Sequence, residues 1–577
     1  MPRKVPTQSR VLNMIFQQAA EKERVSDSQT PLIAIVVASF LDRLGFVEFI
    51  NSVITWDQSQ WRVSPGNLAK SIVLLPFIYP GPRLPICSIF EHYQQMDMDL
   101  LFTSEVHAEW LTRDAISCML DRFFSAGCEN VFTSIALRVY SAFSIPFHPV
   151  VHGDTTSISL YGAYEEEEDT DPSAPDICRG YSKDGRHDLV QVMLGLVCDR
   201  FGLPLIATVR DGNEADCTWN GEIIQTLAEL NPFSKKGVTY IADAKLATAP
   251  NLKKLLKNDF QFITRCPASF SNKVAAGVTR DAYESDAWIP IGSYREDGGK
   301  TLETYAVQEF TRTVEGDITS RLLVFKSSYR RKKFDADMES WQTDFVKYLA
   351  EATKKSFACE KDARNELEDV RKEIRKKHLW TADLSIDTVV TETNPRGRPG
   401  KNPRPKIVVT EWVIRAGEPE LKEDEYLARL RKSESFVLIT NVSSEGVPAE
   451  EVLRLYKEQK TVEDNFSVIK RPMMVDTIYL KKAERIVALM TLLAFSLLVQ
   501  VVIRVLVRRN LDIMETPPGL DHGCKPLVKP GLKKILRFIG YHYVITRDGE
   551  HRFWCISPDH EKNLEIWLRL LEFDVNM

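Results

Sequence analysis

The sequence lacks several features that would assign it to a class at once. Its ten cysteines are scattered and no two of them form a CxxC pair, so the spacing expected of a zinc site is missing. Neither sign of charge dominates, because 75 Lys and Arg residues stand against 80 Asp and Glu residues, for a net charge of −5 at pH 7. The chain is therefore no polycation, and any phosphate-binding surface must come from local clusters of basic residues.

An apolar signal-peptide core is also missing from residues 1–10 (MPRKVPTQSR), so we expect a cytoplasmic protein with reduced thiols. One long apolar run is present at residues 486–503 (IVALMTLLAFSLLVQVVI), with Lys and Arg residues on both sides. The run is long enough to span a bilayer. A fully buried core helix is the favoured interpretation, because nothing else in the sequence resembles a membrane protein.

Basic residues cluster in three segments, 326–333, 396–406 and 525–547, and none of the three contains an acidic residue. Such patches can bind phosphate even when the net charge is slightly negative. Within the second segment, residues 396–399 (RGRP) resemble hooks that bind the minor groove of DNA, with a flexible basic linker as the favoured alternative. The clusters indicate candidate nucleic-acid surfaces without identifying a function.

The length predicts two to four domains, because 577 residues exceed what one hydrophobic core accommodates. Residues 1–145 show apolar spacings of three and four, which predict an all-helical N-terminal domain. Downstream, β-rich and helical segments alternate and predict a mixed α/β sheet covered by helices. After the N-terminal domain we expect a first part of this core at 146–268, an insertion at 269–435, a second part of the core at 436–510 and a small C-terminal region at 511–577.

The predicted elements of the core fall in two parts of the chain, on either side of the insertion. Strands are predicted at 149–161, 189–198, 203–210, 238–243, 260–265 and 436–441, with the second and third forming a hairpin, and helices at 219–230, 246–256 and 447–470. The insertion is expected to contain several strands between 288 and 325, a long polar helical stretch at 335–378 and a linker rich in Pro, Gly and Arg at 394–405. The core is thus interrupted before its last strand and helices.

Two aspartates stand in predicted strands of the core. Asp154 lies within the first strand between the small residues Gly153 and Thr155, and Asp243 ends the strand VTYIAD. Ligand sites gather at strand ends in such sheets, and carboxylates on neighbouring strands repel each other. A divalent cation, Mg²⁺ or Mn²⁺, relieves that repulsion, and two ions about 4 Å apart can activate water and stabilise a leaving oxygen. A structural cap or a surface position is the alternative for each aspartate.

A third acidic residue lies in the predicted helix 447–470. Tyr456, Gln459, Glu463 and Lys470 follow one another at intervals of three, four and seven residues, which places all four on one helical face. Core packing would favour aliphatic side chains there. A carboxylate can complete a metal site, while the phenol, amide and ammonium groups can hold phosphate and sugar oxygens. A solvated face with charge pairs is the alternative.

This segment resembles the YREK signature of bacterial insertion-sequence DDE transposases, in the group named after insertion sequence four. The signature is Tyr, two residues, Arg, three residues, Glu, six residues and Lys. Every spacing is kept in this chain, and the departure is Gln459 in the place of the Arg. Because Gln carries no charge, bidentate binding of phosphate is not expected at this position.

Further segments resemble the same family. Residues 152–164 (HGDTTSISLYGAY) are similar to its first-Asp segment, and residues 241–252 (IADAKLATAPNL) to its second-Asp segment, so Asp243 is preferred to Asp211 or Asp216. The two strands and the turn between these segments, 179–205 and 210–217, are also similar. The likeness runs roughly from residue 30 to 570 and is closest to long-chain members with a helical N-terminal domain.

The resemblance implies a ribonuclease H-like core interrupted by a β-rich insertion before the catalytic Glu. Asp154, Asp243 and Glu463 would hold two divalent ions, water would cut the DNA at the end of the element, and the freed 3′-hydroxyl would attack target DNA. Tyr456, Gln459 and Lys470 would position the cleaved end. Three basic residues near the core by sequence are candidate phosphate contacts, with surface salt bridges as the alternative: Lys183, Arg186 and Lys245. Double-stranded DNA with terminal inverted repeats, target DNA and a second copy of the chain in a synaptic dimer are the implied partners.

Three other interpretations remain at this point. A domesticated relative would bind DNA without cutting it, and the presence of all three acids disfavours simple decay. A different ribonuclease H-like nuclease would hydrolyse without joining, and the YREK-like segment and the helical N-terminal region disfavour it. The interpretation as a membrane protein depends on the apolar run at residues 486–503 alone.

Overall fold

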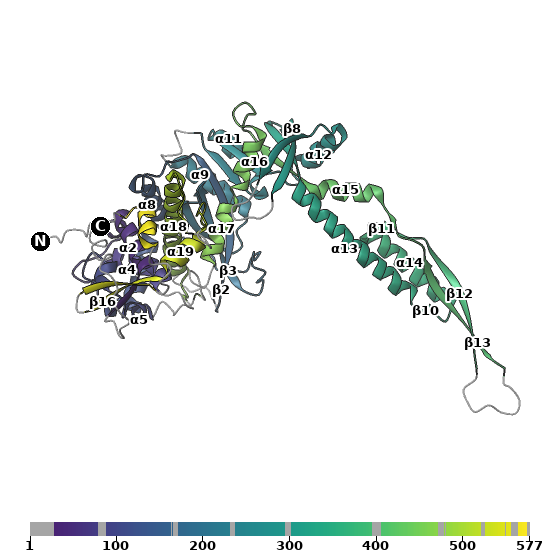
Figure 1. Ribbon diagram of the computed structural model, residues 1–577, viewed down its shortest axis with the longest axis horizontal. Helices are drawn as coiled ribbons and strands as arrows, with labels where there is room; N and C mark the ends of the chain where they lie inside the picture. The colour runs from purple at the N-terminus through teal and green to yellow at the C-terminus, as the bar shows by residue number, and fades with distance from the viewer. Residues whose placement is uncertain are drawn as a thin grey trace. The chain divides into compact units, whose positions relative to one another are not determined.

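The computed structural model of the chain divides into two compact units, unit 1 at Met1–Thr264 with Thr440–Met577 and unit 2 at Arg265–Ile439 (Figure 1). The structure describes residues 28–78, 88–162, 164, 171–230, 237–294, 302–394, 405–470, 478, 480–520, 525–547, 550–555 and 563–573. Most of the linker at 394–405, with the RGRP segment, lies outside the described residues.

The central sheet of unit 1 is mixed. Its strands are β2 (Val150–Leu160), β3 (Val190–Asp199), β4 (Pro204–Arg210), β5 (Thr239–Ala242) and β6 (Gln261–Arg265), in the order β4-β3-β2-β5-β6. Strand β3 is antiparallel to β2 and β4, whereas β5 is parallel to β2 and β6. Apolar and β-branched residues fill these strands and are almost all buried, as expected for a sheet covered on both faces. The predicted mixed α/β class is confirmed.

The turn between β3 and β4 is held by one buried carboxylate. Asp199 Oδ1 accepts hydrogen bonds from the backbone N–H groups of Phe201 and Leu203, each at 2.9 Å, and Oδ2 accepts one from the Tyr140 hydroxyl at 3.0 Å. Gly202 has a φ of +80°, a left-handed conformation that a side chain would strain. The predicted hairpin is therefore fixed by a side-chain cap and a glycine.

The long apolar run forms the buried helix α18 (Ala483–Ile513). It contacts α2 (Leu32–Arg43), α4 (Pro65–Ile78), α7 (Arg113–Ser125) and α8 (Cys128–Ala142). Its polar groups bond to protein, since Ser496 Oγ donates to the Val73 carbonyl at 2.8 Å and Arg504 Nη2 to the Phe201 carbonyl at 2.8 Å. By length and composition this helix alone among the described residues could cross a membrane, yet 94% of its most apolar window is buried inside the protein. The geometry supports a core helix.

The prediction of an all-helical N-terminal region is wrong at its first described residues. Strand β1 (Ser28–Pro31) pairs antiparallel with β16 (His542–Arg547), which in turn pairs with β17 (Glu550–Cys555). The partner of β1 lies near the other end of the chain, so local periodicity in the sequence carries no sign of the pairing. Helices follow β1 as predicted, beginning with α2.

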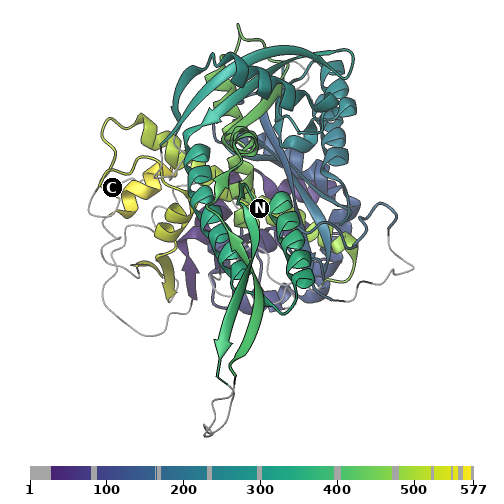
Figure 2. The same cartoon turned by 90° about the vertical axis from the view of Figure 1, so that its right-hand side faces the viewer.

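Unit 2 contains a sheet and a helical pair. Its strands β7 (Ile289–Tyr294), β8 (Glu303–Val314) and β9 (Ile318–Ser327) form two consecutive antiparallel pairs. The polar stretch predicted at 335–378 is two helices, α13 (Ser328–Thr353) and α14 (Glu360–Lys377), which lie beside the antiparallel ribbon of β12 (Leu384–Thr393) and β13 (Ile407–Ala416) (Figure 2). A small core joins helices and ribbon, with Phe345, Val370, Ile374 and Ile414 buried in it.

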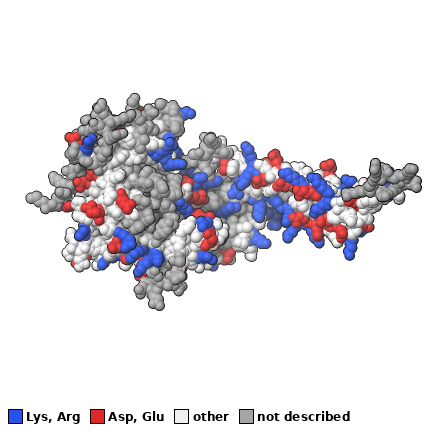
Figure 3. Space-filling view, turned by 90° about the horizontal axis from the view of Figure 1, so that it is seen from below, with Lys and Arg blue, Asp and Glu red and all other residues white. Residues whose placement is uncertain are grey.

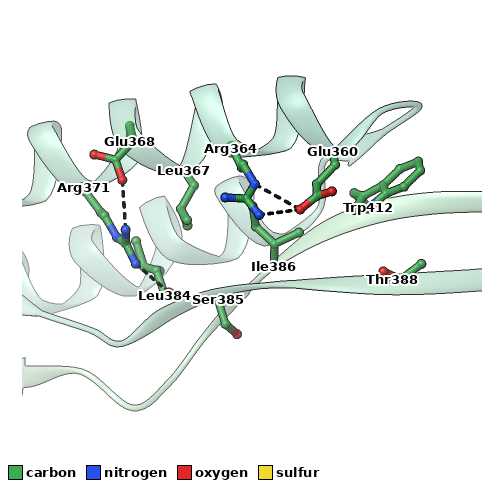
Figure 4. A pocket seen from close by; sticks show the side chains of 10 residues that line it. All are labelled: Glu360, Arg364, Leu367, Glu368, Arg371, Leu384, Ser385, Ile386, Thr388 and Trp412. Atoms are coloured by element: carbon green, nitrogen blue, oxygen red, sulfur yellow. Dashed lines mark hydrogen bonds and ion pairs between the residues drawn. The ribbon is translucent and has the colours of Figure 1, made fainter.

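A groove of about 590 Å³ lies between α14 and the β12–β13 ribbon (Figure 4). Its two guanidinium groups are already paired, Arg364 with Glu360 at 2.6 Å and Arg371 with Glu368 at 2.9 Å, and Arg371 also donates to the Leu384 carbonyl. Only residues of unit 2 line the groove, and none of the predicted site residues is among them.

Helix α18 gives a test of the core. Replacing Leu493, which is 1% exposed, by Ala should lower the free energy of unfolding by about 2–5 kcal/mol, because a cavity remains. Ile513 on the same helix is 74% exposed, and its replacement by Ala should change the stability by less than about 0.5 kcal/mol. Denaturant unfolding of both variants beside the parent chain measures the difference. Equal losses in the two variants would show that α18 is not packed as described.

Candidate active site

Asp154 and Asp243 lie side by side at the junction of β2 and β5. The two strands are parallel, and Gly153 of β2 pairs in register with Ala242 of β5, so each aspartate is the next residue along its strand. Asp243 directly follows β5, and its side chain accepts a hydrogen bond from the backbone N–H of Lys245 at 2.9 Å. The structure thus brings two of the three predicted acids together, and one of them also caps a short 3₁₀ turn.

Gly153 is required by the packing beneath the first aspartate. A Cβ atom added at this position would lie 2.2 Å from the hydroxyl of Tyr240, which is buried and donates to Asn220 Oδ1 at 2.7 Å. A side chain at 153 would therefore have to displace the buried ring of Tyr240. The glycine beside Asp154 leaves room for that ring.

A third carboxylate, Asp216, and the ammonium group of Lys183 complete the cluster. Lys183 Nζ lies 3.8 Å from Asp154 Oδ1 and 3.4 Å from Asp216 Oδ1. The same ammonium donates to the backbone carbonyl of Thr155 at 2.7 Å, and the Thr155 hydroxyl donates to Asp216 Oδ1 at 2.5 Å. Asp216 begins helix α9 (Asp216–Glu229). The family resemblance favours Asp243 over Asp216, and nothing in residues 210–217 alone indicates that Asp216 lies near β2.

Burial and like charge both act on the two strand aspartates. Burial raises the pKa of Asp154 to about 6; the nearby Lys183 ammonium opposes this rise, and the carboxylates of Asp243 and Asp216 add to it. Burial also raises the pKa of Asp243, with a further contribution from Asp216. Carboxylates that repel one another in a partly desolvated place are hard oxygen donors suited to Mg²⁺ or Mn²⁺. These side chains therefore fit a divalent cation.

Glu463 lies on a shorter helix than the one predicted from the sequence. The predicted helix 447–470 is two helices, α16 (Ala449–Lys457) and α17 (Lys460–Ile469), with Lys470 as the C-cap of the second. At the junction the backbone tightens, since the N–H of Gln459 donates to Tyr456 and that of Val462 to Gln459. The prediction of one unbroken helix is therefore wrong, and Gln459 is buried whereas Glu463 is exposed, so these two residues do not share a solvent-facing side.

Glu463 is exposed on α17, and α17 packs against β2 and β3. In the part of the chain that the structure describes, no three His, Cys, Asp or Glu side chains gather closely enough to hold one metal ion. Glu463 is thus on an element that touches the strand of Asp154, but the structure does not bring its carboxylate into the cluster.

Gln459 faces the interior of the protein. Its side-chain Nε2 donates to the Gly153 carbonyl at 2.9 Å, and its Oε1 lies 3.2 Å from Nδ1 of the buried His152. The residue is 8% exposed. Both ends of the amide are therefore engaged within the fold, on the backbone that leads into Asp154.

Two of the other residues predicted to contact DNA, Lys470 and Arg186, form ion pairs with neighbouring aspartates. Lys470 Nζ pairs with Asp184 at 2.7 Å, and Arg186 pairs with Asp188 through two nitrogens at 2.9 and 2.8 Å. Lys245 is exposed and Tyr456 half-buried. On the face drawn in Figure 3, basic and acidic side chains are interspersed. Contact of these residues with DNA stays a prediction.

Comparison with known families gives two matches. Residues 147–499 match the family model described as "Transposase DDE domain", which is more than half of the 577-residue chain and includes all three predicted acids. Residues 32–137 match a model described as "Domain of unknown function (DUF4277)". No curated protein matches the chain.

The raised pKa of Asp154 predicts how pH changes metal binding. The pKa of Asp154 is about 6 in the folded protein, against an ordinary value of 3.8, so the folded state binds this proton more tightly than the unfolded state does. The protonated carboxyl therefore stabilises the fold at low pH, and this stabilisation is lost as the pH rises through about 6. A divalent cation competes with that proton. Stabilisation by Mg²⁺ should therefore be larger at about pH 7.5 than at about pH 5, measured as the rise in melting temperature on adding Mg²⁺.

The Asp154→Asn variant is the control, since it removes the titrating carboxyl and should lose most of the pH-dependent response to Mg²⁺. An equal response to Mg²⁺ at both pH values in the parent chain would contradict binding at Asp154.

Proposed function

Because the chain belongs to the DDE transposase family, we propose that it cuts the ends of an insertion sequence and joins each freed 3′-hydroxyl to target DNA by metal-dependent phosphoryl transfer. The family acts on DNA and normally uses divalent metal ions. The observation that carries the proposal for this chain is the parallel register of β2 and β5, which sets Asp154 beside Asp243 within the matched region.

We further propose that Asp154, Asp243 and Glu463 are the catalytic acids and hold two Mg²⁺ or Mn²⁺ ions. Asp154 and Asp243 supply adjacent, partly desolvated oxygen donors. Glu463 completes the set from α17, the helix that packs against the strand of Asp154. Bound divalent ions supply positive charge and lower the pKa of water, so that hydroxide becomes available near neutral pH.

The proposed reaction has two displacements at phosphorus. Water attacks the phosphodiester at the element end, the bond to the 3′-oxygen breaks, and the strand ends in a 3′-hydroxyl. That hydroxyl then attacks a phosphodiester of target DNA and a bond to a target 3′-oxygen breaks, so no covalent enzyme intermediate forms. The chain's own acids must be ionised for this work, which the burial of Asp154 opposes below about pH 6. The Lys183 ammonium beside Asp154 favours the ionised form.

Several finer assignments belong to the same proposal. The core is ribonuclease H-like with an insertion before Glu463, and the chain is a long member of the insertion-sequence-four group. Tyr456 and Lys470 position the cleaved DNA end, with Lys183, Arg186 and Lys245 as phosphate contacts. Two copies act together in the cytoplasm on an element with terminal inverted repeats.

The acids can be tested singly. Glu463→Gln, Asp154→Asn and Asp243→Asn should each remove cleavage of a duplex that carries the element end, with a rate loss on the order of a thousandfold or more, because charge on the metal site is lost. Binding of the same duplex without metal should stay within about twofold, measured by fluorescence anisotropy. Full cleavage activity in any of the three variants would remove that residue from the catalytic set.

A second measurement separates this proposal from its alternatives. Incubated with Mg²⁺, a pre-cleaved element end and an unlinked plasmid, the parent chain should produce joined products. Cleavage without joining would indicate a nuclease. Binding without cleavage would indicate a domesticated relative, which the presence of all three acids disfavours.

A further inference from the structure

We propose that Gln459 is a positioning residue: together with the buried His152 it fastens the helix that carries Glu463 to the strand that carries Asp154. The inference rests on the proposed function, because it concerns how the third acid is kept near the first two. It assigns to Gln459 a place inside the protein, whereas the sequence pattern alone suggested a contact with DNA.

The contact between the two elements is specific in geometry. The backbone carbonyl of Gly153 can only accept, so the Gln459 amide presents Nε2 to it, at 2.9 Å. The amide oxygen then faces Nδ1 of His152 at 3.2 Å, and because that oxygen can only accept, Nδ1 carries the hydrogen. His152 is 0% exposed and Gln459 is 8% exposed. One amide therefore bonds to two consecutive residues of β2, directly before Asp154.

Gln459 lies close to Glu463 in the chain, so the contact of Gln459 with β2 restrains the helix that carries Glu463. Gln459 stands at the junction of α16 and α17, one helical turn before Glu463. A second buried amide follows Glu463, since Asn465 is 1% exposed and its Nδ2 donates to the Gly202 carbonyl at 2.8 Å. Glu463 itself is exposed. The two buried amides on either side of Glu463 thus bond α17 to β2 and to the β3–β4 turn, in addition to the buried apolar residues of the helix.

The chemistry of the contact also accounts for an amide at this position. A guanidinium group in the same place would bring a charge into a nearly closed space between a backbone carbonyl and an imidazole. An amide matches one acceptor and one donor at the same time. The neutral side chain at 459 is therefore suited to an internal bridge.

The test uses the full chain and compares Gln459→Met with the parent. Methionine keeps the size of the side chain but cannot form either hydrogen bond. Cleavage at saturating DNA should fall on the order of tenfold to a hundredfold, because a small displacement of a catalytic group is costly. The Mg²⁺ concentration for half-maximal cleavage should rise. Affinity for the element-end duplex without metal should stay within about twofold. Ser467→Ala, an exposed change on the same helix, should leave all three quantities unchanged.

His152 provides an independent arm, because a fully buried side chain cannot touch DNA. His152→Leu should reproduce the Gln459→Met effects, whereas His152→Asn places an amide N–H near the position of Nδ1 and should restore cleavage towards the parent level. The double variant Gln459→Met/His152→Leu should be no worse than the more affected single variant, since both remove one shared contact. If Gln459→Met does not fold, the comparison of His152→Leu with His152→Asn still tests whether the contact positions Glu463.

Three results would overturn the inference. The first is a loss of DNA affinity of about tenfold or more in Gln459→Met, with cleavage at saturating DNA unchanged. The second is additivity of the Gln459→Met and His152→Leu effects, and the third is parent-like cleavage in both His152 variants. Failure of the proposed function looks different, because the parent chain would then not cleave at all, or Glu463→Gln would cleave normally, whatever residue stands at 459.

Discussion

The parallel pairing of β2 with β5 imposes the constraint on which the site depends. It places Asp154 beside Asp243 in a partly buried position, where desolvation and mutual repulsion raise the free energy of the two ionised carboxylates. The protein offsets part of this cost with one ammonium group, Lys183, which lies between Asp154 and Asp216. A second ammonium group, that of Lys245, also acts on Asp243, so two positive charges stand against the three carboxylates. The strand register, and not a flexible loop, thus holds the carboxylates of Asp154 and Asp243 side by side.

The surroundings of the two aspartates are arranged to keep that register. Strand β2 lies between β3 and β5 in the sheet, and Gly153 leaves room for the buried Tyr240. The turn that follows β3 is fixed by the Asp199 carboxylate and is bonded to α17 through Asn465. Arg504 of α18 donates to the same turn, so the apolar helix at the centre of unit 1 also supports the site. Rigid elements on several sides carry the residues proposed to act on DNA.

The strands of the core could be predicted from the sequence because each is a short apolar run between turn residues, and β2 to β6 all lie where expected. Features that depend on distant contacts could not. The break between α16 and α17 escapes a periodicity argument because Glu458 and Gln459 both keep right-handed helical dihedral angles. Asp216 joins the cluster only through the fold. The domain limits, the role of Glu463 and the DNA contacts of Tyr456 and Lys470 stay predictions.

The pairing of β1 with β16 has a consequence for how the protein is made. Ser28 is opposite Thr546, so the first described strand cannot pair until β16 has left the ribosome. During synthesis the edge formed by residues 28–31 is open to other strands, which is a hazard for nascent chains. Closure of this small sheet thus waits for the synthesis of β16, although β1 is made long before it.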